Sequence, residues 1–302
     1  MRLATLDPGQ GRPPRPAAQT ASGWVYLDEL VPNLQTLLPH RESFLSIVPK
    51  LAANRALKVS GDPVFLPPVL QPRAFRDFYA FEQHVKTCRE KRGAKVAPEW
   101  YEIPVFYFSN PGSLIGSGAT VYAPHGCAEL DYELELGIVI GKAGKDIDPQ
   151  DAWDHVAGFT IINDFSARDL QRKEMAVGLG PAKGKDFGTA VGPCLVTLDE
   201  FSDVLDADGR VNLAMSARIN GKEYSRGNAK AMHHPWPQII AQASRDAELF
   251  VGDLIGSGTV GSGCILELGP ETTGGWLKPG DVVELEIERL GVLRNTVVVR
   301  PM

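Results

Sequence analysis

The stretch LDYELELGIVIGK, residues 130–142, alternates acidic and apolar side chains and then becomes apolar throughout. In a β-strand successive side chains point to opposite faces, so Asp131, Glu133 and Glu135 would share one face. Neighbouring acids on that face lie about 6.5 Å apart, and each like-charged pair costs roughly 2.5 kcal/mol at an effective dielectric constant of 20. Because residues 138–140 are apolar on both faces, the strand is predicted to run into the protein interior. The acids therefore need a counter-charge.

A second stretch with alternating acids provides a contrast. Residues 282–299 place Arg289 and Arg294 around a Gly-centred turn, which predicts a half-exposed hairpin with cross-strand ion pairs. No basic residue follows the acids of residues 130–142 before Lys142. Buried carboxylates without histidine or cysteine ligands favour hard cations. A divalent metal, Mg²⁺ or Mn²⁺ with Ca²⁺ as a further option, would suit these acids, but the strand by itself supplies too few ligands and does not decide for a metal.

Composition limits the class of protein. The 302 residues are 43% hydrophobic and carry a formal net charge of −6, which indicates a large core and argues against a nucleic-acid partner. No apolar run is long enough to cross a membrane, and the first residues lack the apolar core of a signal peptide. We expect a cytoplasmic protein with no membrane partner and with its four scattered cysteines reduced.

The chain is expected to divide into two parts. Residues 1–68 are predicted to form a small N-terminal α/β domain and linker, with a helix within 41–57, and residues 69–302 to form the main domain. Helices are predicted at 76–93 and 237–249. Strands are predicted at 104–110, 129–141, 155–164, 192–198, 211–221, 263–269, 281–290 and 293–301. Because helices are few, the expected fold class is α+β and mostly β.

A second polar segment, GFTIINDFSARDLQRKE, follows a buried-looking strand. Asp164 falls where that strand ends, a common place for ligands. Ser166 and Asp169 resemble a capping box that opens a helix, and Arg168 and Gln171 would then point the same way. A simple cap with surface charges explains the segment equally well.

A Gly-rich loop at 178–193 holds Lys183 and Lys185. It does not fit the phosphate-binding pattern GxxxxGK[ST], since Asp186 follows Lys185. A lysine held by such a loop near several acids can instead stabilise a developing oxyanion.

These segments together resemble the fumarylacetoacetate hydrolase superfamily over roughly residues 65–290. The resemblance is carried, in order, by DFYAFEQH at 77–84, ELELG at 133–137, NDFSARDLQ at 163–171, GKDFGT at 184–189 and the SGT…LEL segment at 257–268. It implies a mixed β-sandwich roll as the main domain, and a homodimer.

The resemblance also assigns residues to roles. The implied metal ligands are Asp77, Glu133, Glu135 and Asp164. The implied catalytic residues are His84 as general base, Glu267 as the acid that orients it, and Arg168, Gln171 and Lys185 as oxyanion-stabilising groups. The implied substrate contacts are Tyr79, Tyr107 and Thr259.

The activity implied is metal-dependent hydrolysis of a carbon–carbon bond in a 1,3-diketo acid, such as fumarylacetoacetate or an acylpyruvate. His84 would activate water while the metal polarises the carbonyl and stabilises the enolate that leaves. Met175 stands where fumarylacetoacetase has a tyrosine, and its substrate arginine has no certain counterpart among Arg89, Lys91 and Arg92. The substrate tail is therefore open.

Two alternatives remain. Superfamily members also decarboxylate oxaloacetate, isomerise hydroxymuconate-type diacids or hydrate dienoates. The decarboxylases pair their histidine with a glutamate three residues later, and here that residue is Thr87. A metal-stabilised scaffold without turnover is the third hypothesis. The joint presence of His84, Glu267 and Lys185 argues against it.

Overall fold

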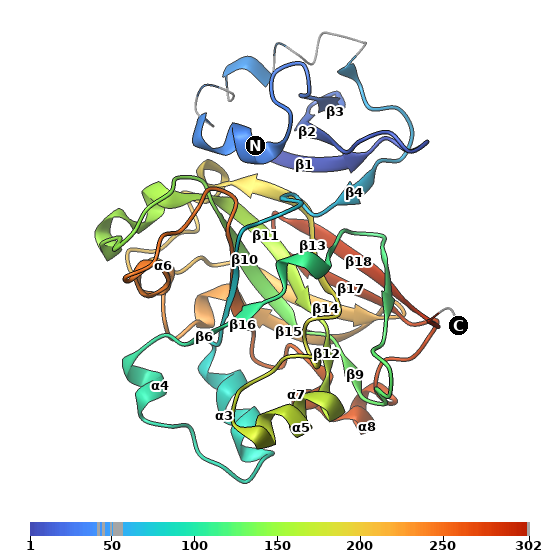
Figure 1. The fold of residues 1–302 in the computed structure, drawn as a ribbon, viewed down its shortest axis with the longest axis vertical. Helices are drawn as coiled ribbons and strands as arrows, with labels where there is room; N and C mark the ends of the chain where they lie inside the picture. Colours follow the sequence, from blue (N-terminus) through green and yellow to red (C-terminus); the bar gives the residue numbers. More distant parts are fainter. Residues whose placement is uncertain (41–42, 44–45, 49, 51–56, 301–302) are drawn as a thin grey trace.

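The computed structural model describes residues 1–40, 43, 46–48, 50 and 57–300. The chain folds into two large β-sheets flanked by short helices, so the predicted mostly-strand α+β class is confirmed (Figure 1). The helix predicted within 41–57 falls mainly outside the described residues. Within the described part of the chain, no helix is both long and apolar enough to span a bilayer.

The first sheet is the frame of the molecule. Nine of its strands follow one path, in the order β3 (Gly23–Tyr26), β2 (Arg15–Thr20), β1 (Arg2–Asp7), β13 (Thr189–Thr197), β11 (Val156–Asp164), β10 (Leu134–Ile140), β16 (Leu254–Thr259), β5 (Phe75–Phe78) and β6 (Phe106–Ser109). Two further strands extend it, β4 (Val64–Leu66) beside β1 and β7 (Leu114–Ile115) beside β13. The sheet is mainly antiparallel, but β16 and β5 run parallel.

The second sheet covers one face of the first. Its order is β15 (Lys222–Asn228), β14 (Ala214–Ile219), β17 (Val282–Ile287), β18 (Gly291–Val298) and β8 (Thr120–Tyr122). A small separate pair joins β9 (Leu130–Asp131) to β12 (Ser166–Ala167). As predicted, β17 and β18 form an antiparallel hairpin in which Glu284 faces Arg294 and the two side chains form an ion pair.

The helices of the described residues are short. The α-helices among them are α1 (Leu34–Leu37), α3 (Glu82–Glu90), α4 (Glu99–Glu102), α5 (Arg168–Val177), α6 (Trp236–Ser244), α7 (Ile265–Leu268) and α8 (Pro270–Thr273). The 3₁₀-helices are η1 (Leu38–His40), η3 (Pro111–Ser113), η4 (Pro149–His155), η5 (Leu198–Phe201) and η6 (Ala229–Ala231). Figure 1 shows α3, α5, α7 and α8 gathered at the end of the molecule opposite the N-terminal strands.

Strand β10 is packed on both of its faces, as its alternating side chains show. Leu134, Leu136 and Ile138 belong to the core cluster between the two sheets. Val139 belongs to the cluster on the opposite face, under α1. Since side chains alternate along a strand, Glu135 lies on the same face as Val139, toward the end of the sheet where α3, α5 and α7 gather.

The N-terminal strands continue the first sheet. β1 pairs with β13 through Leu3 and Leu195, and Ala4 and Leu6 join the core between the sheets. The predicted boundary of the N-terminal domain at residue 68 stays a prediction.

Two elements differ from the sequence prediction because of long-range contacts. The single helix predicted at 76–93 is wrong in its first part, since Phe75–Phe78 forms β5, which is paired with β16 and β6, and the helix begins only at Glu82. The strand predicted at 263–269 is wrong as well, because Ile265–Leu268 forms the helical turn α7, whose first N–H groups donate to Asp131.

The predicted strand at 129–141 is interrupted. Asp131 ends β9, β10 begins at Leu134, and the N–H of Glu133 donates to Asn163 Oδ1 at 3.0 Å. The predicted capping box is also wrong, because Ser166 lies in β12 and α5 begins without a side-chain cap. Asp131 therefore does not lie in one row with Glu133 and Glu135, and its side chain contacts different residues.

Candidate active site

Three buried carboxylates converge from three strands of the first sheet. Asp77 lies on β5, Glu135 on β10, and Asp164 is the last residue of β11, as predicted from the strand end. Each offers an oxygen within 4.8 Å of the others, and their exposed fractions are 2%, 1% and 0%. We call Asp77, Glu135 and Asp164 the carboxylate cluster. Oxygen-only donors of this kind suit a hard divalent cation.

Gly256 keeps the space between two of these acids. It lies on β16, opposite Asp77 in the sheet and next to β10. A Cβ atom at this position would lie 2.2 Å from Asp77 Oδ1 and 3.2 Å from Glu135 Oε2. Any larger residue would therefore fill the gap that the two carboxylates face.

The charges of the carboxylate cluster are incompletely balanced. Asp77 Oδ1 and Glu135 Oε2 are buried and have no hydrogen-bond partner among the described residues. Burial raises the pKa of Asp77 and of Glu135 well above the usual range, and neighbouring carboxylates raise both further. Orphaned, desolvated oxygens are costly unless a cation binds them. The residues present thus fit a divalent metal.

Glu133, the fourth predicted ligand, contacts two cationic side chains. Its carboxylate accepts hydrogen bonds from Arg168 Nη2 at 2.7 Å and from Lys185 Nζ. Burial raises the pKa of Glu133, but the positive charges of Lys185 and Arg168 outweigh this and hold it well below its usual range. Lys185 Nζ joins Glu133 to Asp164, so Glu133 adjoins the carboxylate cluster, and its role as a metal ligand stays a prediction.

Asp164 connects the cluster to its surroundings. Its Oδ2 accepts hydrogen bonds from Lys185 Nζ at 2.5 Å and from the Tyr107 hydroxyl at 2.6 Å. Its Oδ1 accepts one from Thr189 at 3.1 Å. Lys185 is buried, and Asp164 and Glu133 raise its pKa despite its burial, so it remains an ammonium ion.

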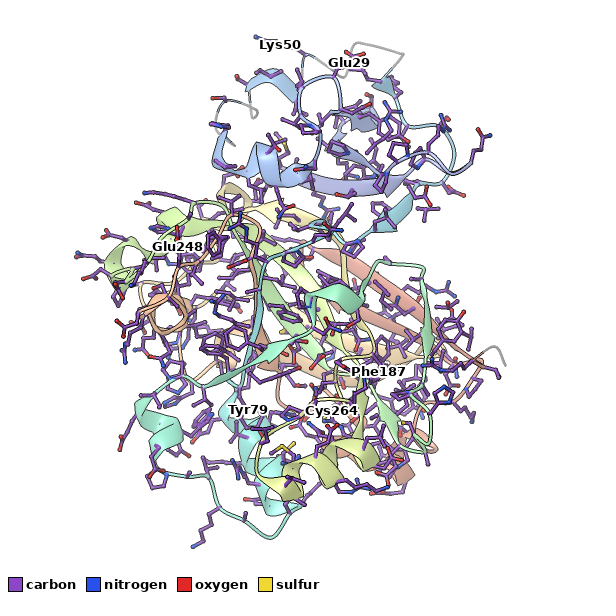
Figure 2. The ribbon with its side chains drawn as sticks, viewed as in Figure 1. Glu29, Lys50, Tyr79, Phe187, Glu248 and Cys264 are labelled. Atoms are coloured by element: carbon purple, nitrogen blue, oxygen red, sulfur yellow. The ribbon has the colours of Figure 1, made fainter. Side chains whose placement is uncertain are left out.

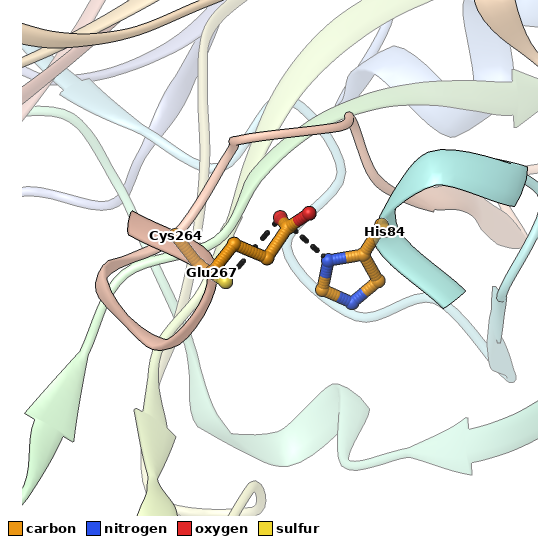
Figure 3. Close-up of side chains that lie close together, drawn as sticks. All are labelled: His84, Cys264 and Glu267. Atoms are coloured by element: carbon orange, nitrogen blue, oxygen red, sulfur yellow. Dashed lines mark hydrogen bonds and ion pairs between the residues drawn. The ribbon is translucent and has the colours of Figure 1, made fainter. Parts of the chain in front are cut away.

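A histidine–glutamate pair lies across the cavity. His84 on α3 donates from Nδ1 to Glu267 Oε2 on α7 at 2.7 Å, as Figure 3 shows. Glu267 is fixed in turn by the N–H groups of Ser262 and Gly263. Burial lowers the pKa of His84, but its contacts with Cys264 and Glu267 outweigh this and raise it to about 10. The pairing expected from the resemblance is present.

Asp131 is a positioning residue that the sequence analysis did not identify. It accepts a hydrogen bond from Arg168 Nε and others from the N–H groups of Ile265 and Leu266, at the start of α7. It therefore joins the oxyanion candidate Arg168 to the helix that carries Glu267. Its place between Leu130 and Tyr132, in an otherwise buried stretch, is the only local signal of such a role.

A cavity of about 220 Å³ opens between these groups. Its lining includes ten of the twelve predicted site residues, namely Asp77, Tyr79, His84, Tyr107, Glu133, Glu135, Arg168, Gln171, Lys185 and Thr259. The other two, Asp164 and Glu267, lie behind the lining and contact Lys185 and His84. The structure thus brings the predicted site together; which role each residue plays stays a prediction.

Arg168 and Gln171, and the predicted substrate contacts Thr259 and Tyr79, each contact another residue of the site. Arg168 Nη1 donates to Gln171 Oε1 at 3.2 Å, which confirms that the two share a helix face. The Thr259 hydroxyl donates to Glu135 Oε1, and the Tyr79 ring lies edge-on against His84. In Figure 2, Tyr79 and Cys264 both lie in the lower part of the molecule, near the gathered helices.

The outer wall of the cavity combines apolar and basic side chains. Val105, Phe106 and Met175 contribute apolar surface, and Arg89 and Arg92 contribute positive charge. His233 and His234, by contrast, pack on Trp100, and His234 Nε2 hydrogen-bonds the Trp100 carbonyl oxygen.

Comparison with known proteins gives a consistent result. Residues 73–298 match the family model described as fumarylacetoacetate (FAA) hydrolase C-terminal. The human protein named oxaloacetate tautomerase FAHD2A, mitochondrial, is 34% identical over 90% of this chain and 82% of its own length. The Arabidopsis thaliana protein named fumarylacetoacetase is 30% identical over 78% of this chain and 67% of its own.

Solved structures agree with this match. The fumarylacetoacetate hydrolase from the psychrophile Exiguobacterium antarcticum superposes with a TM-score of 0.76 at 26% identity, covering 99% of this chain and 100% of that chain.

Proposed function

The chain belongs to the fumarylacetoacetate hydrolase family, and from this premise we propose that it is a metal-dependent hydrolase of a 1,3-diketo acid. The reaction would cleave a carbon–carbon bond with water and release a carboxylic acid and a ketone-bearing acid. The observation that carries the proposal is the His84–Glu267 pair, which shares one cavity with the carboxylate cluster and Lys185.

The carboxylate cluster would hold the cation through Asp77, Glu135 and Asp164. The orphaned oxygens of Asp77 and Glu135 and the gap left by Gly256 support this assignment. Mg²⁺ or Mn²⁺ suits such oxygen donors. When bound, the cation supplies Lewis-acid polarisation of substrate oxygens, a contribution of several kcal/mol.

His84 would activate water. Because its pKa is raised to about 10, His84 must first lose the proton on Nε2; with Nδ1 donating to Glu267, Nε2 is then the nitrogen that accepts a proton from water. A base of this kind typically contributes about 10²–10⁴ in rate. In hydrolysis the water oxygen bonds to the acyl carbon, the carbon–carbon bond breaks, and its electron pair is protonated on the departing ketone fragment.

Lys185, Arg168 and Gln171 would stabilise the negative charge that develops on the attacked carbonyl. Two of the three protons of the Lys185 ammonium are directed at Glu133 and Asp164, which leaves one for the substrate. Asp131 and Glu133 fix the guanidinium of Arg168. Donors that are fixed before the reaction need no reorganisation during it.

The outer wall favours an acylpyruvate-like substrate with an extended tail. Val105, Phe106 and Met175 would pack on an unsaturated or aliphatic chain, and Arg89 and Arg92 would attract a second carboxylate at its end. A four-carbon acid such as oxaloacetate would leave most of this wall unused.

The second candidate is tautomerisation or decarboxylation of oxaloacetate, favoured by the similarity to the human protein named for that tautomerase activity. The same cation and proton-transfer groups would serve it. Thr87, at the position of the decarboxylase glutamate implied by the resemblance, donates its hydroxyl to the Gln83 carbonyl oxygen.

Isotope incorporation from ¹⁸O-labelled water separates the candidates. Acylpyruvates, fumarylacetoacetate and oxaloacetate would be incubated with the enzyme and Mg²⁺ or Mn²⁺, and loss of enol absorbance followed. Hydrolysis places one ¹⁸O in the carboxylate of the acyl fragment. Loss of enol absorbance without cleavage or without carboxylate label would contradict hydrolysis. A cytoplasmic location and a homodimer stay predictions.

A further inference from the structure

A second group of metal-binding side chains lies beside the cavity. His84 and Cys88 are one helical turn apart on α3, and Cys264 and Glu267 are three residues apart at the start of α7. We call these four residues the thiol cluster. His84, Cys88 and Cys264 are 4%, 2% and 0% exposed, and Figure 3 shows His84, Cys264 and Glu267 turned toward one another.

The spacing within the thiol cluster is close to that of a tetrahedral zinc site. Cys88 Sγ lies 3.8 Å from His84 Nδ1, the nitrogen that faces Glu267, and Cys264 Sγ lies 3.5 Å from Glu267 Oε2. Ligand atoms of His84, Cys264 and Glu267 all lie within 4.8 Å of one another. Zn²⁺ holds sulfur at about 2.3 Å and nitrogen or oxygen at about 2.0–2.2 Å, so tetrahedral neighbours are roughly 3.3–3.8 Å apart.

One contact must change for an ion to enter. The 2.7 Å contact between His84 Nδ1 and Glu267 Oε2 is shorter than a tetrahedral edge and has to widen by about 0.6 Å. A route exists, since His84 and Cys88 both line the cavity.

The two clusters differ in donor chemistry. The carboxylate cluster offers oxygen alone, which suits Mg²⁺ and Mn²⁺. The thiol cluster offers two sulfurs, an imidazole and one carboxylate, which suit Zn²⁺ and other thiophilic cations. The carboxylate cluster would therefore bind the hard cations, and the neighbouring thiol cluster the thiophilic ones.

We propose that the thiol cluster is a second metal site, selective for Zn²⁺ or another thiophilic divalent cation, and that an ion bound there inhibits the enzyme. Inhibition follows because the ion takes the imidazole of His84 and the carboxylate that orients it. The prediction that a bound ion inhibits the enzyme, the inhibitory half of the proposal, rests on the proposed function. The prediction that the thiol cluster binds a cation, the binding half, does not.

Cobalt spectroscopy tests the binding half. Co²⁺ would be added to the reduced, metal-stripped full chain in excess Mg²⁺, which occupies the carboxylate cluster. We expect a sulfur-to-cobalt charge-transfer band that saturates at one Co²⁺ per chain and is displaced by Zn²⁺. Cys88→Ser and Cys264→Ser should each weaken Co²⁺ binding about tenfold or more, whereas Cys127→Ser and Asp77→Asn should retain the band.

The wild-type titration alone can overturn the proposal, whatever the folding of the variants. Absence of the sulfur-to-cobalt band in the wild type contradicts the site, and so does a band that persists in the folded Cys88→Ser/Cys264→Ser double variant. Circular dichroism establishes that each variant is folded.

Turnover in Mg²⁺ tests the inhibitory half. Each protein is compared with itself, with and without Zn²⁺. One equivalent of Zn²⁺ should abolish wild-type turnover, and Cys264→Ser should need at least tenfold more. Equal inhibition of both proteins would contradict the assignment of inhibition to this cluster. Absence of turnover on every substrate would count against the proposed function, while the cobalt band would still report the site.

Discussion

Asp131 Oδ2 accepts a hydrogen bond from Arg168 Nε at 2.8 Å, and both side chains are almost wholly buried. The same carboxylate accepts hydrogen bonds from the first N–H groups of α7, the helix that carries Glu267. One acid thus fixes both the guanidinium beside the cavity and the residue that orients His84.

Replacement of Asp131 by Asn should therefore affect stability and turnover together. Removal of one partner from a buried ion pair costs about 3 kcal/mol, and in Asp131→Asn the buried Arg168 keeps, among the described residues, only the counter-charge of Glu133, which Lys185 also shares. Urea unfolding of Asp131→Asn measures this loss. The matched control is Glu129→Gln, which breaks the surface pair with Arg172 and should cost less than about 1 kcal/mol. Equal losses in the two variants would contradict the positioning role.

Replacement of His84 by Ala should lower kcat by about 10²–10⁴, because no other group holds the proton-accepting nitrogen at this place. The affinity for Mn²⁺ should stay nearly unchanged, since His84 lies outside the carboxylate cluster. His233→Asn is the control and should retain activity. A His84→Ala enzyme with wild-type turnover would defeat the enzymatic interpretation.

Replacement of Gly256 by Ala should weaken metal binding at least tenfold. The added methyl group would lie 2.2 Å from Asp77 Oδ1, so the carboxylate has to move. The buried Gly188 is the control, since a Cβ there meets nothing within 4 Å. Calorimetric titration with Mg²⁺ or Mn²⁺ distinguishes them, and equal affinities would show that Gly256 does not shape the site.

The hydrogen bonds of Glu174 predict that the contribution of this side chain to protein stability is lost in acid. It accepts hydrogen bonds from the N–H groups of Ala182, Lys183 and Gly184, directly before Lys185. Partial burial raises the pKa of Glu174, but these three donors outweigh it and lower the pKa below its ordinary value of 4.5. A lowered folded-state pKa contributes stability above pH 4.5 that is lost as the pH falls through the folded-state value.

Glu174→Gln should therefore unfold about 1 kcal/mol more easily than the wild type at pH 7. This difference should stay constant down to about pH 5 and shrink below pH 4.5 as Glu174 itself becomes protonated. Urea unfolding of both proteins between pH 3.5 and 7 measures it. A difference that grows toward low pH would contradict the assignment.

The local pattern predicted those elements whose partners are near in sequence. The hairpin of β17 and β18 follows from alternation around one turn, and β10 follows from its apolar run. β5 and β16 were missed or misassigned because their pairing joins Asp77 to Gly256, far apart in the chain. The Gly-rich sequence of β16 resembles a turn, yet Gly256 makes room for the carboxylates.

The site was predicted through five short motifs rather than through any single residue. The family resemblance placed Glu133 among the metal ligands, which stays a prediction. Nothing in the sequence indicated that Arg168 and Lys185 would both form ion pairs with Glu133. Asp131 was missed for the related reason that its partners in α7 lie 134 and 135 residues away. The spacings of His84 to Cys88 and of Cys264 to Glu267 were visible signals that went unused.

The central claim is that Asp77, Glu135 and Asp164 bind one divalent cation, and Mn²⁺ titration followed by electron paramagnetic resonance tests it most directly. The wild type should bind one Mn²⁺ per chain, and Glu135→Gln should bind it at least tenfold more weakly. Glu267→Gln removes a nearby carboxylate outside the cluster and should bind as the wild type does. A wild-type chain that leaves Mn²⁺ free in solution, or a Glu135→Gln chain with unchanged affinity, would contradict the account.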